Sequence, residues 1–511
     1  MSPKLTNFLL VLGLIVLSAA IVADSMTKPI GHDEQMYCTA AALLAQGKLI
    51  YKDYSYIAQL PYHPTVCAAL FKLFHTTRYL LVCRLLSAVC DILTITLIVA
   101  IYCSVLKGLP IASRLLGFAA AVLYIFNPIV DYANGFAWNH DIVILCVLLS
   151  LFLFITTDFR KKSKYWRAAA MGGLLTFASW TRMTTVLVYL IFLRALLNST
   201  NESLKQRLKT ILLFIIASLF VSIWPLFIIA AAPRAFILNI FVVPIFNGEL
   251  LRQVIQIPGP SQVIFNCLTT PAYIILILTA AYFCITLALS RRKINIENKA
   301  NVLLPVILVI VFFVITFIPP AMFKQYFAMP ALFIIISFAY PLLYLSKLTS
   351  SAGTRIHFRI ASVIIAFAAV ITVGSHSIVA KRIPALLNPQ SWPPNRLHNI
   401  SEDIARRTKE PKRILTLAPL YALEGGCEIY PQFSAGIFVY RIAGVMNEQA
   451  IAAVNGAGPE NLLALIENSP PSAVIIGTEP GGFEEPLYKA AVKPDWTRKN
   501  YHPCPVVFFR P

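Results

Sequence analysis

The stretch PIGHDEQMYCTAAALLAQG, residues 29–47, places two adjacent carboxylates, Asp33 and Glu34, just beyond the first apolar run of the chain. Asp33 is expected to be the N-cap of a short helix, with Glu34 at the positive end of its dipole. Gly47 is expected to end that helix. One face of it is apolar, formed by Met36, Ala40, Leu43 and Leu44. The pattern predicts an amphipathic helix at a membrane surface that presents a carboxylate in its first turn.

The composition around this stretch is that of a membrane protein. The 511 residues are 58% hydrophobic and only 13% charged, whereas a soluble domain is usually about a quarter charged. Apolar runs near the roughly 20 residues that cross a bilayer as a helix recur up to residue 379. The sequence therefore predicts an α-helical polytopic membrane protein with about eleven transmembrane helices. We place them near 5–23, 79–105, 114–131, 139–157, 168–181, 183–198, 210–232, 271–290, 301–319, 327–345 and 360–379.

The formal net charge of +20 comes from basic clusters between the apolar runs. They lie at 160–167, 205–209, 291–299 and 347–359. With the amino terminus inside, every cluster falls on the cytoplasmic side, as the positive-inside rule requires. Anionic membrane lipids are the expected partners of these clusters, and no nucleic acid is expected.

Composition changes after residue 380. The segments RILTLAP, SAVIIG and PVVFFR predict short buried strands, and NISEDIARR and PENLLALIEN predict amphipathic helices that begin at Ser401 and Pro459. We expect a transmembrane domain at 1–380, with an outer loop at 24–78, and a small extracytoplasmic α/β domain at 381–511. The proline-containing segment 233–270 is expected to be irregular and partly re-entrant.

Two cysteine pairs lie on the outer side of this topology. Cys38 could form a disulfide with Cys67, and Cys427 with Cys504. The ten cysteines show no metal-ligand spacing.

The first outer loop resembles a known family. It carries D-E-x-x-Y, then A-x-x-L-x-x-G-x-x-x-Y-x-D, then a proline-rich turn: Asp33, Glu34, Tyr37, Ala41, Leu44, Gly47, Tyr51, Asp53, Pro61 and Pro64. This block resembles the GT-C superfamily of polytopic glycosyltransferases, in the branch of the protein O-mannosyltransferases and the lipid A aminoarabinose transferases. Many relatives have a lysine before paired prolines, where this chain has Gln59-Leu60-Pro61-Tyr62-His63-Pro64. Weaker similarity extends to 126–154, with Asp141, and to AMFKQYFAMP, with Lys324, Tyr326 and Pro330.

The resemblance implies an inverting glycosyltransferase. It would move a sugar from a polyprenyl-phosphate donor to a glycolipid, polysaccharide or protein acceptor on the outer, periplasmic side of a bacterial cytoplasmic (inner) membrane. Such a displacement needs a base at the nucleophile and positive charge at the leaving phosphate.

The residues expected to fill these roles follow from that chemistry. Asp33 would take the proton of the acceptor, and Glu34 would position the acceptor or a cation. His140 and Asp141 would lie across the cleft, with Tyr326 among the substrate-binding residues. Arg182, Lys324 and His63 would hold the phosphate. A divalent metal ion is possible, and no cofactor is certain.

Structural interpretations remain open for each of these residues. Asp33 and Asp141 could only cap helices, Lys324 could be a membrane-interface anchor, and Arg182 could pair with Asp91 or Asp131. A secondary transporter, or a polysaccharide polymerase or ligase without the Asp-Glu chemistry, is the alternative function. The absence of internal repeats and the acids at outer span ends argue against a transporter.

Overall fold

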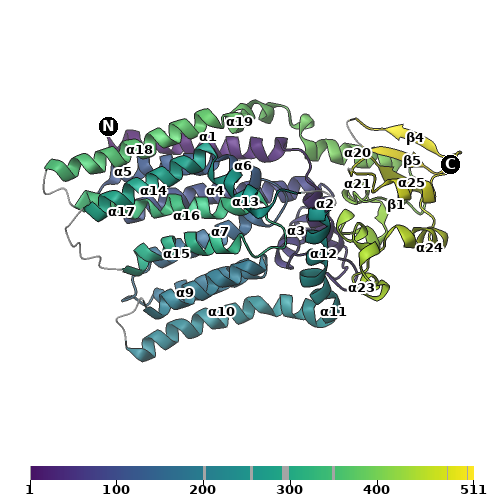
Figure 1. The fold of residues 1–511 in the computed structure, drawn as a ribbon, viewed down its shortest axis with the longest axis horizontal. Helices are drawn as coiled ribbons and strands as arrows, with labels where there is room; N and C mark the ends of the chain where they lie inside the picture. Colours follow the sequence, from purple (N-terminus) through teal and green to yellow (C-terminus); the bar gives the residue numbers. More distant parts are fainter. Residues whose placement is uncertain are drawn as a thin grey trace.

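The structure is a computed structural model that describes residues 2–198, 203–253, 257–289, 299–347, 352–479, 481–502 and 505–511. It is a long bundle of helices joined at one end to a small α/β unit (Figure 1). The predicted basic cluster at 291–299 lies almost entirely outside the described residues.

The bundle is built from apolar helices that overlap the predicted spans. Five are long: α1 (Pro3–Thr27), α4 (Tyr79–Val105), α10 (Leu204–Ala231), α14 (Pro271–Leu289) and α18 (Ala352–Ser375). The others are α5 (Pro110–Ile125), α7 (His140–Thr156), α8 (Lys164–Ser179), α9 (Val186–Asn198), α15 (Lys299–Ile315), α16 (Ala328–Ser337) and α17 (Ala339–Lys347). By length and composition, seven described segments can cross a membrane, and four shorter apolar helices accompany them.

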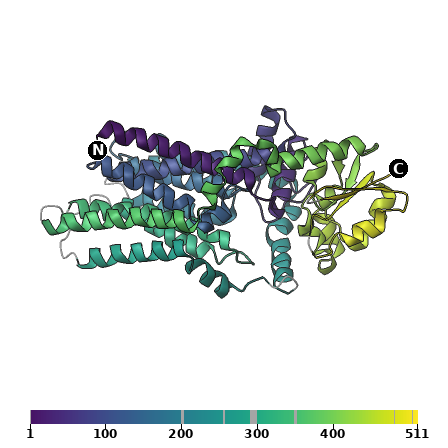
Figure 2. The same cartoon turned by 90° about the horizontal axis from the view of Figure 1, so that it is seen from above.

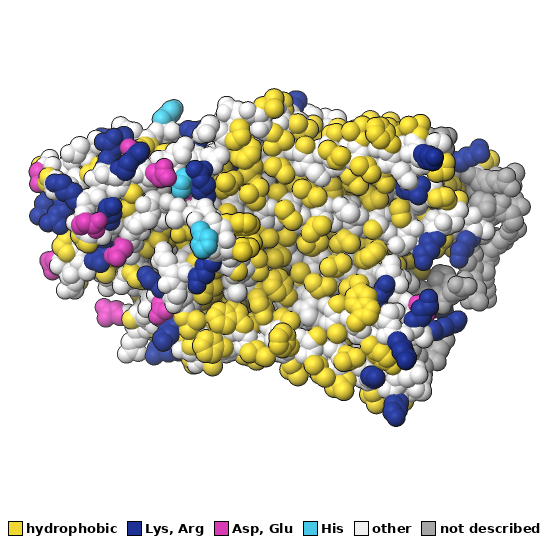
Figure 3. Space-filling model, turned by 180° about the vertical axis from the view of Figure 1, so that it is seen from behind, with side chains coloured by type: hydrophobic (Ala, Val, Ile, Leu, Met, Phe, Trp, Pro, Cys, Tyr) yellow, Lys and Arg dark blue, Asp and Glu magenta, His cyan; other side chains and the backbone are white. Residues whose placement is uncertain are grey.

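The surface of the bundle matches a lipid environment. Figure 3 shows a broad band of hydrophobic side chains, with Lys and Arg gathered at the end away from the α/β unit. Large apolar side chains are exposed along the band, including Phe8, Phe220 and Val370. In water such a surface would be unfavourable, so the band is the part that faces lipid.

The outer loop contains the predicted helix, α2 (His32–Ala45), and a second helix, α3 (Tyr62–Leu73), which pack against each other. The segment 233–270, expected to be irregular, is instead mostly helical. It forms α11 (Pro233–Ile237), the π-helical η2 (Leu238–Val242), α12 (Val243–Gln253) and α13 (Pro260–Leu268). Pro233 and Pro260 stand in first helical turns, where proline is tolerated. The α11–α12 segment lies across the end of the bundle rather than along it (Figures 1 and 2).

The π-helical turn η2 explains why α12 stays beside the outer loop. A π-helical turn frees a carbonyl from the regular ladder. The Asn239 carbonyl accepts from the Ala58 N–H at 2.9 Å, and its side-chain oxygen accepts from the Tyr56 N–H at 3.0 Å. This turn therefore ties α12 to the outer loop.

Residues 381–511, the C-terminal unit, form a five-stranded sheet of order β2-β1-β3-β5-β4. Its strands are β1 (Arg413–Leu415), β2 (Glu428–Ile429), β3 (Ala473–Ile476), β4 (Thr497–Asn500) and β5 (Val506–Phe509). β2, β1 and β3 are parallel, and β5 and β4 are antiparallel to their neighbours. The helices include α20 (Pro393–Arg407), α21 (Leu420–Leu423), α22 (Ile437–Tyr440), α23 (Glu448–Ala453), α24 (Leu462–Asn468) and α25 (Glu485–Ala491).

β1, β3 and β5 form where the sequence predicts strands, whereas β2 and β4 are not predicted. The prediction that a helix starts at Ser401 is wrong. α20 starts at Pro393, and the Ser401 hydroxyl donates to the Leu397 carbonyl at 2.9 Å inside that helix.

The outer loop and the C-terminal unit share one hydrophobic core, which contains Tyr37, Leu43, Leu420 and Leu423. The Leu420 N–H donates to the Gln35 side chain at 3.1 Å. The Leu80 N–H at the start of α4 donates to Glu424 at 2.7 Å. The C-terminal unit is therefore packed onto the loop rather than loosely tethered to it.

The predicted disulfide between Cys38 and Cys67 is not formed. Both residues are buried free thiols in the core of the outer loop. Cys427 is also a free thiol, and its predicted partner Cys504 lies outside the described residues.

Candidate active site

Helix α2 begins two residues earlier than the sequence suggests. Its N-cap is Gly31, and the Gly31 N–H donates to the Glu34 carboxylate at 2.8 Å. The prediction that Asp33 is the N-cap is therefore wrong, because Glu34, three residues after the cap, satisfies the helix start. Asp33 lies in the first turn, where its carboxylate is not used to cap the helix.

Glu34 is instead buried in a bidentate ion pair with Arg84 of α4. Arg84 Nε and Nη2 lie 2.8 and 2.7 Å from the two Glu34 oxygens, and both side chains are 0% exposed. The Ala137 N–H adds a third donor to Glu34, at 2.7 Å. Arg84 also donates to the carbonyls of Lys28 and Pro29. This pair joins α2, α4 and the loop before α7, and it occupies both oxygens of Glu34.

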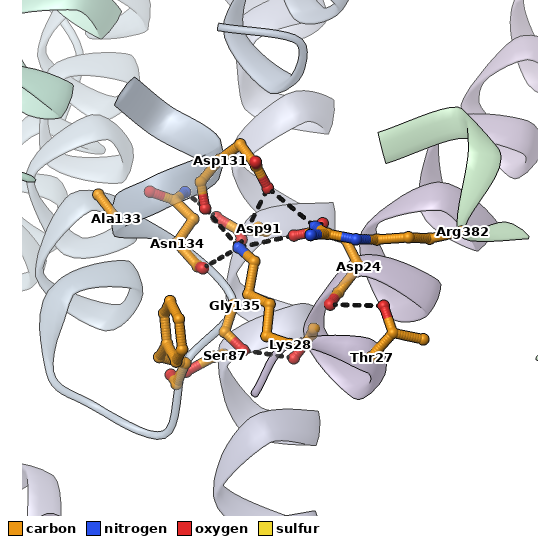
Figure 4. Close-up of polar contacts among 12 residues, drawn as sticks. Asp24, Thr27, Lys28, Ser87, Asp91, Asp131, Ala133, Asn134, Gly135 and Arg382 are labelled. Atoms are coloured by element: carbon orange, nitrogen blue, oxygen red, sulfur yellow. Dashed lines mark hydrogen bonds and ion pairs between the residues drawn. The ribbon is translucent and has the colours of Figure 1, made fainter. Parts of the chain in front are cut away.

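A second ionic cluster lies beneath the outer loop and surrounds Lys28 at the end of α1 (Figure 4). Lys28 Nζ is 2.7 Å from Asp24 and 3.2 Å from Asp131 of α6 (Pro128–Ala133), and it donates to the Asn134 carbonyl at 2.7 Å. Arg382 also pairs with Asp24 and Asp131. Three segments that are distant in sequence are thereby fixed around one buried lysine, which together with Arg382 balances the two acids in this apolar setting.

The loop after α6 passes close to α1 at Gly135. Its φ is +74°, and a Cβ there would lie 3.3 Å from Ser25, so glycine is needed for conformation and for space. The Gly135 N–H donates to Asp141 at 3.0 Å, and the second Asp141 oxygen has no hydrogen-bond partner among the described residues. Asp141 is fully buried and anchors this loop from the first turn of α7.

Asp33 has a different environment from Glu34. It keeps partial exposure and forms no hydrogen bond or ion pair within the described part of the chain. Burial raises the pKa of its carboxyl, while the nearby charges of His32 and Arg441 lower that pKa and Glu34 raises it. Asp33 is thus a carboxylate with free oxygens at the outer end of the bundle.

Arg182 lies beside Tyr326, and the charges of Arg182 and Asp33 both act on that tyrosine. The Arg182 guanidinium lies 5.2 Å from the centre of the Tyr326 ring, and its Nη1 is 3.2 Å from His140 Nδ1. The charges of both Asp33 and Arg182 act on Tyr37, one helical turn after Asp33. Arg182 forms no ion pair with any described carboxylate, so the expected alternative partners Asp91 and Asp131 do not bind it.

Lys324 comes from the neighbouring η3 (Lys324–Phe327), which packs against α6. Its Nζ lies 3.6 Å from the centre of the Tyr132 ring, and it is exposed and without an ion-pair partner in the described ranges. Asp33 also acts electrostatically on Tyr132. A second cation is therefore available on the bundle side of Asp33.

His63 is placed apart from this cluster. It is buried in the core of the outer loop, with its ring edge-on to Tyr37 at 5.2 Å and its Nε2 3.8 Å from Cys67 Sγ. Its position is behind Tyr37 rather than beside Arg182.

Several residues of the site are not predicted from the sequence. Arg84 could have been noticed, because a charge inside an apolar span must have a partner. Asn139 donates to the Gln59 side chain at 2.7 Å and to the Thr181 carbonyl at 3.0 Å. Nothing in the sequence around Asn139 indicates these contacts. Among the described residues, no group of three or more His, Cys, Asp or Glu side chains is arranged to hold a metal ion.

No protein-family description matches the sequence, and no curated protein is similar to it at a significant level. Solved structures do match. ArnT from Cupriavidus metallidurans bound to undecaprenyl phosphate has a TM-score of 0.59 at 14% identity, covering 98% of this chain and 98% of that chain. The apo form of the same protein gives 0.59 at 13% identity, covering 99% and 98%.

The oligosaccharyltransferase of Archaeoglobus fulgidus in the apo form gives a TM-score of 0.49 at 13% identity, covering 94% of this chain and 71% of that chain. The ArnT match extends over the helical bundle and the C-terminal unit alike, because almost the whole of both chains is aligned. The fold of this chain is therefore GT-C-like, as the motifs of the first outer loop predict.

Proposed function

We propose that this protein is an inverting glycosyltransferase that moves a sugar from a polyprenyl-phosphate donor to an acceptor at the outer surface of the membrane. The observation that carries the proposal is the pair of neighbours on α2. Glu34 is fully engaged by Arg84, whereas Asp33 has free oxygens, and the charges of Asp33 and Arg182 both act on Tyr37 and Tyr326. A base and an unpaired cation that border the same side chains are the two groups that displacement of a phosphate requires.

The fold supports a lipid-linked donor. A structure with this fold was determined bound to undecaprenyl phosphate. The cluster around Asp33 lies where the apolar band of the bundle meets the outer loop. A donor with an isoprenoid tail could present its phosphate and sugar there while the tail stays in the bilayer.

In the proposed reaction, Asp33 accepts the proton of an acceptor hydroxyl or amine as that atom attacks the anomeric carbon of the sugar. The bond from this carbon to the phosphate oxygen breaks on the opposite side, which inverts the configuration. The electron pair leaves with the polyprenyl phosphate. Arg182 and Lys324 would stabilise its developing negative charge, because no described carboxylate neutralises either cation.

The remaining predicted residues act indirectly in this proposal. Glu34 positions Asp33 through the ion pair with Arg84 and does not itself touch the acceptor. His140 orients Arg182, Tyr326 supports the guanidinium from its ring face, and Asp141 holds the loop at Gly135. His63 has no contact with the phosphate, because it packs behind Tyr37.

We further propose that residues 1–380 form the catalytic membrane domain and that the C-terminal unit lies outside the membrane with the site. The basic end of the bundle would then face the cytoplasm, in keeping with the positive-inside rule. A bacterial cytoplasmic membrane with an undecaprenyl carrier and a periplasmic site fits this arrangement. The acceptor would be a glycolipid, a polysaccharide or a protein.

The test is mass spectrometry of lipid-linked sugars and envelope glycans from cells that lack the protein and are complemented with variants. The wild type should restore a sugar modification, and Asp33→Asn should lower its transfer by at least about 100-fold, the usual contribution of a general base. Asp495→Asn replaces an exposed acid of the C-terminal unit and should retain transfer. An identical glycan profile with and without the protein, or full transfer by Asp33→Asn, would refute the proposal.

A further inference from the structure

The segment Pro233–Arg252, which contains α11, η2 and α12, has the length and composition of a membrane span. It nevertheless lies across the end of the bundle, whereas the spans run along it (Figures 1 and 2). The chain leaves α10 at Ala232, where φ is −152° and ψ is 64°, so the helix is broken and a new direction begins at Pro233. The segment is therefore a separate element of the outer end and not a continuation of α10.

The packing of the C-terminal unit on the outer loop excludes a crossing by this segment. Between the outer loop and the end of α10, the chain passes along the bundle six times, as α4, α5, α7, α8, α9 and α10. Between α13 and the C-terminal unit it passes four times, as α14, α15, α16 with α17, and α18. Because both numbers are even and the C-terminal unit contacts the outer loop, the segment begins and ends on the side of that loop.

One face of the segment is bound to the rest of the protein. Asn239 accepts hydrogen bonds from the backbone of the outer loop, as described above. Asn247 of α12 donates to the Phe438 carbonyl at 2.9 Å and accepts from Arg441 Nε at 2.7 Å. Val243 is buried between these two asparagines in the sequence. This face therefore holds the outer loop and the C-terminal unit together through α12.

The other face carries an apolar row formed by Ile237, Phe241 and Ile245. Their side chains are 54%, 45% and 56% exposed. Since they are spaced four residues apart, they lie on one side of the helix. Arg234 and Arg252 are exposed near the two ends of the row. Three large apolar side chains in a row are unfavourable in water, so this face needs an apolar environment.

The lipid-facing band of the bundle supplies that environment. Phe227, near the end of α10, belongs to the exposed apolar surface of the bundle, and Phe265 of α13 is exposed after the segment. The apolar row is thus flanked in the chain by other exposed aromatic side chains. An apolar face with cationic side chains at its ends is typical of helices that lie in the plane of a membrane surface.

We infer that Pro233–Arg252 is a membrane-surface anchor whose apolar row inserts among the acyl chains of the leaflet on the side of the outer loop. Asn239 and Asn247, on the opposite face, connect this anchor to the outer loop and to the C-terminal unit. The anchor therefore fixes the height of both parts above the bilayer. The inference concerns only the contact with lipid, so it stands or falls independently of the proposed sugar transfer.

Spin-label accessibility in nanodiscs of phosphatidylcholine and phosphatidylglycerol tests the inference. Ile237→Cys, Phe241→Cys and Ile245→Cys are labelled one at a time in full-length protein that also carries Cys284→Ala and Cys504→Ser. Each label should collide more often with oxygen, which concentrates among acyl chains, than with a water-soluble nickel chelate. The three depths should be equal. In a crossing helix, the eight residues from Ile237 to Ile245 would instead span a difference in depth of about 12 Å.

Two matched positions calibrate the measurement. Phe220→Cys, near the middle of α10 and highly exposed, should be deeper in the lipid than the apolar row. Lys493→Cys, exposed on the C-terminal unit, should collide mainly with the nickel chelate. Collisions dominated by nickel along the apolar row would place it in water, and few collisions with either reagent would indicate a protein partner or a second copy. Either result overturns the inference, as does a difference in depth of about 12 Å.

A second experiment needs no label on the apolar row. Ser261 is exposed in the first turn of α13, just beyond the segment. Ser261→Cys and Leu387→Cys, which lies beside the C-terminal unit, should react with a membrane-impermeant maleimide from the same side of the membrane. Reaction from opposite sides would mean that Pro233–Arg252 crosses the bilayer, and it would overturn the inference whichever way the protein is oriented.

Discussion

At the scale of single residues, Asp33 and Glu34 are neighbours with opposite environments. Glu34 points inward and receives three kinds of donor, from Arg84, Gly31 and Ala137. Asp33 is partly exposed and receives none from the described residues. One residue of helical rotation, about 100°, is enough to separate a fully paired acid from one with free oxygens.

The pH dependence of activity follows from the environment of Asp33. Burial raises the pKa of this carboxyl, so the acid remains protonated to a higher pH than a free aspartate. A general base works only when deprotonated. Transfer should therefore fall as pH decreases through a value above 3.8, which a kcat/KM profile between pH 4 and 8 measures. A profile that stays flat through the acidic range would contradict Asp33 as the base.

The Glu34–Arg84 pair should dominate the stability of the outer loop. Arg84→Ala leaves a buried, unpaired carboxylate and should lower the free energy of unfolding by about 3–5 kcal/mol. Arg84→Lys should recover little, because lysine cannot donate in the bidentate geometry. Thermal or denaturant unfolding in detergent gives the measurement. Arg406→Ala, at a side chain 73% exposed, is the matched control and should change stability by less than about 1 kcal/mol.

Single residues also set the limit of what the sequence predicts. Asp33 was identified because motif and helix start coincide in one short stretch. Arg182 is predicted because a charge near lipid is costly without a purpose, and Lys324 is predicted because AMFKQYFAMP resembles a segment of the family. Arg441 and Asn247 were not, because they are unremarkable until α12 and the C-terminal unit meet. Arg441 and Asn247 contact each other although they are more than 190 positions apart in the chain, so no local sequence pattern predicts this contact.

At the scale of elements, apolar length predicted the bundle well, although the span near 114–131 divides into α5 and α6 and the span near 327–345 divides into α16 and α17. It failed for 233–270, where prolines suggested irregular chain. Pro233 and Pro260 stand in first turns, so they start helices instead of breaking them. The strands β2 and β4 were missed for a related reason: β2 has two residues and β4 is polar, so neither has the alternation that marks a strand.

The packing of α1 against α6 depends on Lys28. Lys28→Met leaves Asp24 and Asp131 buried without their lysine, although Arg382 still contacts both. We expect a loss of about 3 kcal/mol in the free energy of unfolding, at the lower end for a broken buried pair because of Arg382. Adding Asp24→Asn should restore part of it, since one of the unbalanced charges is removed. A double variant less stable than Lys28→Met alone would contradict this account.

At the scale of the whole molecule, the basic end and the C-terminal unit define an orientation. Leu387 is highly exposed beside the C-terminal unit, and Lys162 is exposed between α7 and α8. In intact cells, a membrane-impermeant maleimide should label Leu387→Cys, and it should label Lys162→Cys only after permeabilisation. The buried native cysteines of the outer loop should stay unlabelled. If Lys162→Cys is labelled in intact cells and Leu387→Cys only after permeabilisation, the proposed orientation is wrong.

The common core of the outer loop and the C-terminal unit restricts how this molecule can be re-engineered or diversified. A chimera that exchanges residues 381–511 alone would set foreign side chains against Tyr37 and Leu43 and lose the partners of Gln35 and Leu80. A productive exchange has to include 24–80 as well. A change of acceptor preference would therefore require coordinated changes in two segments, the outer loop with α2 and the C-terminal unit that packs on it.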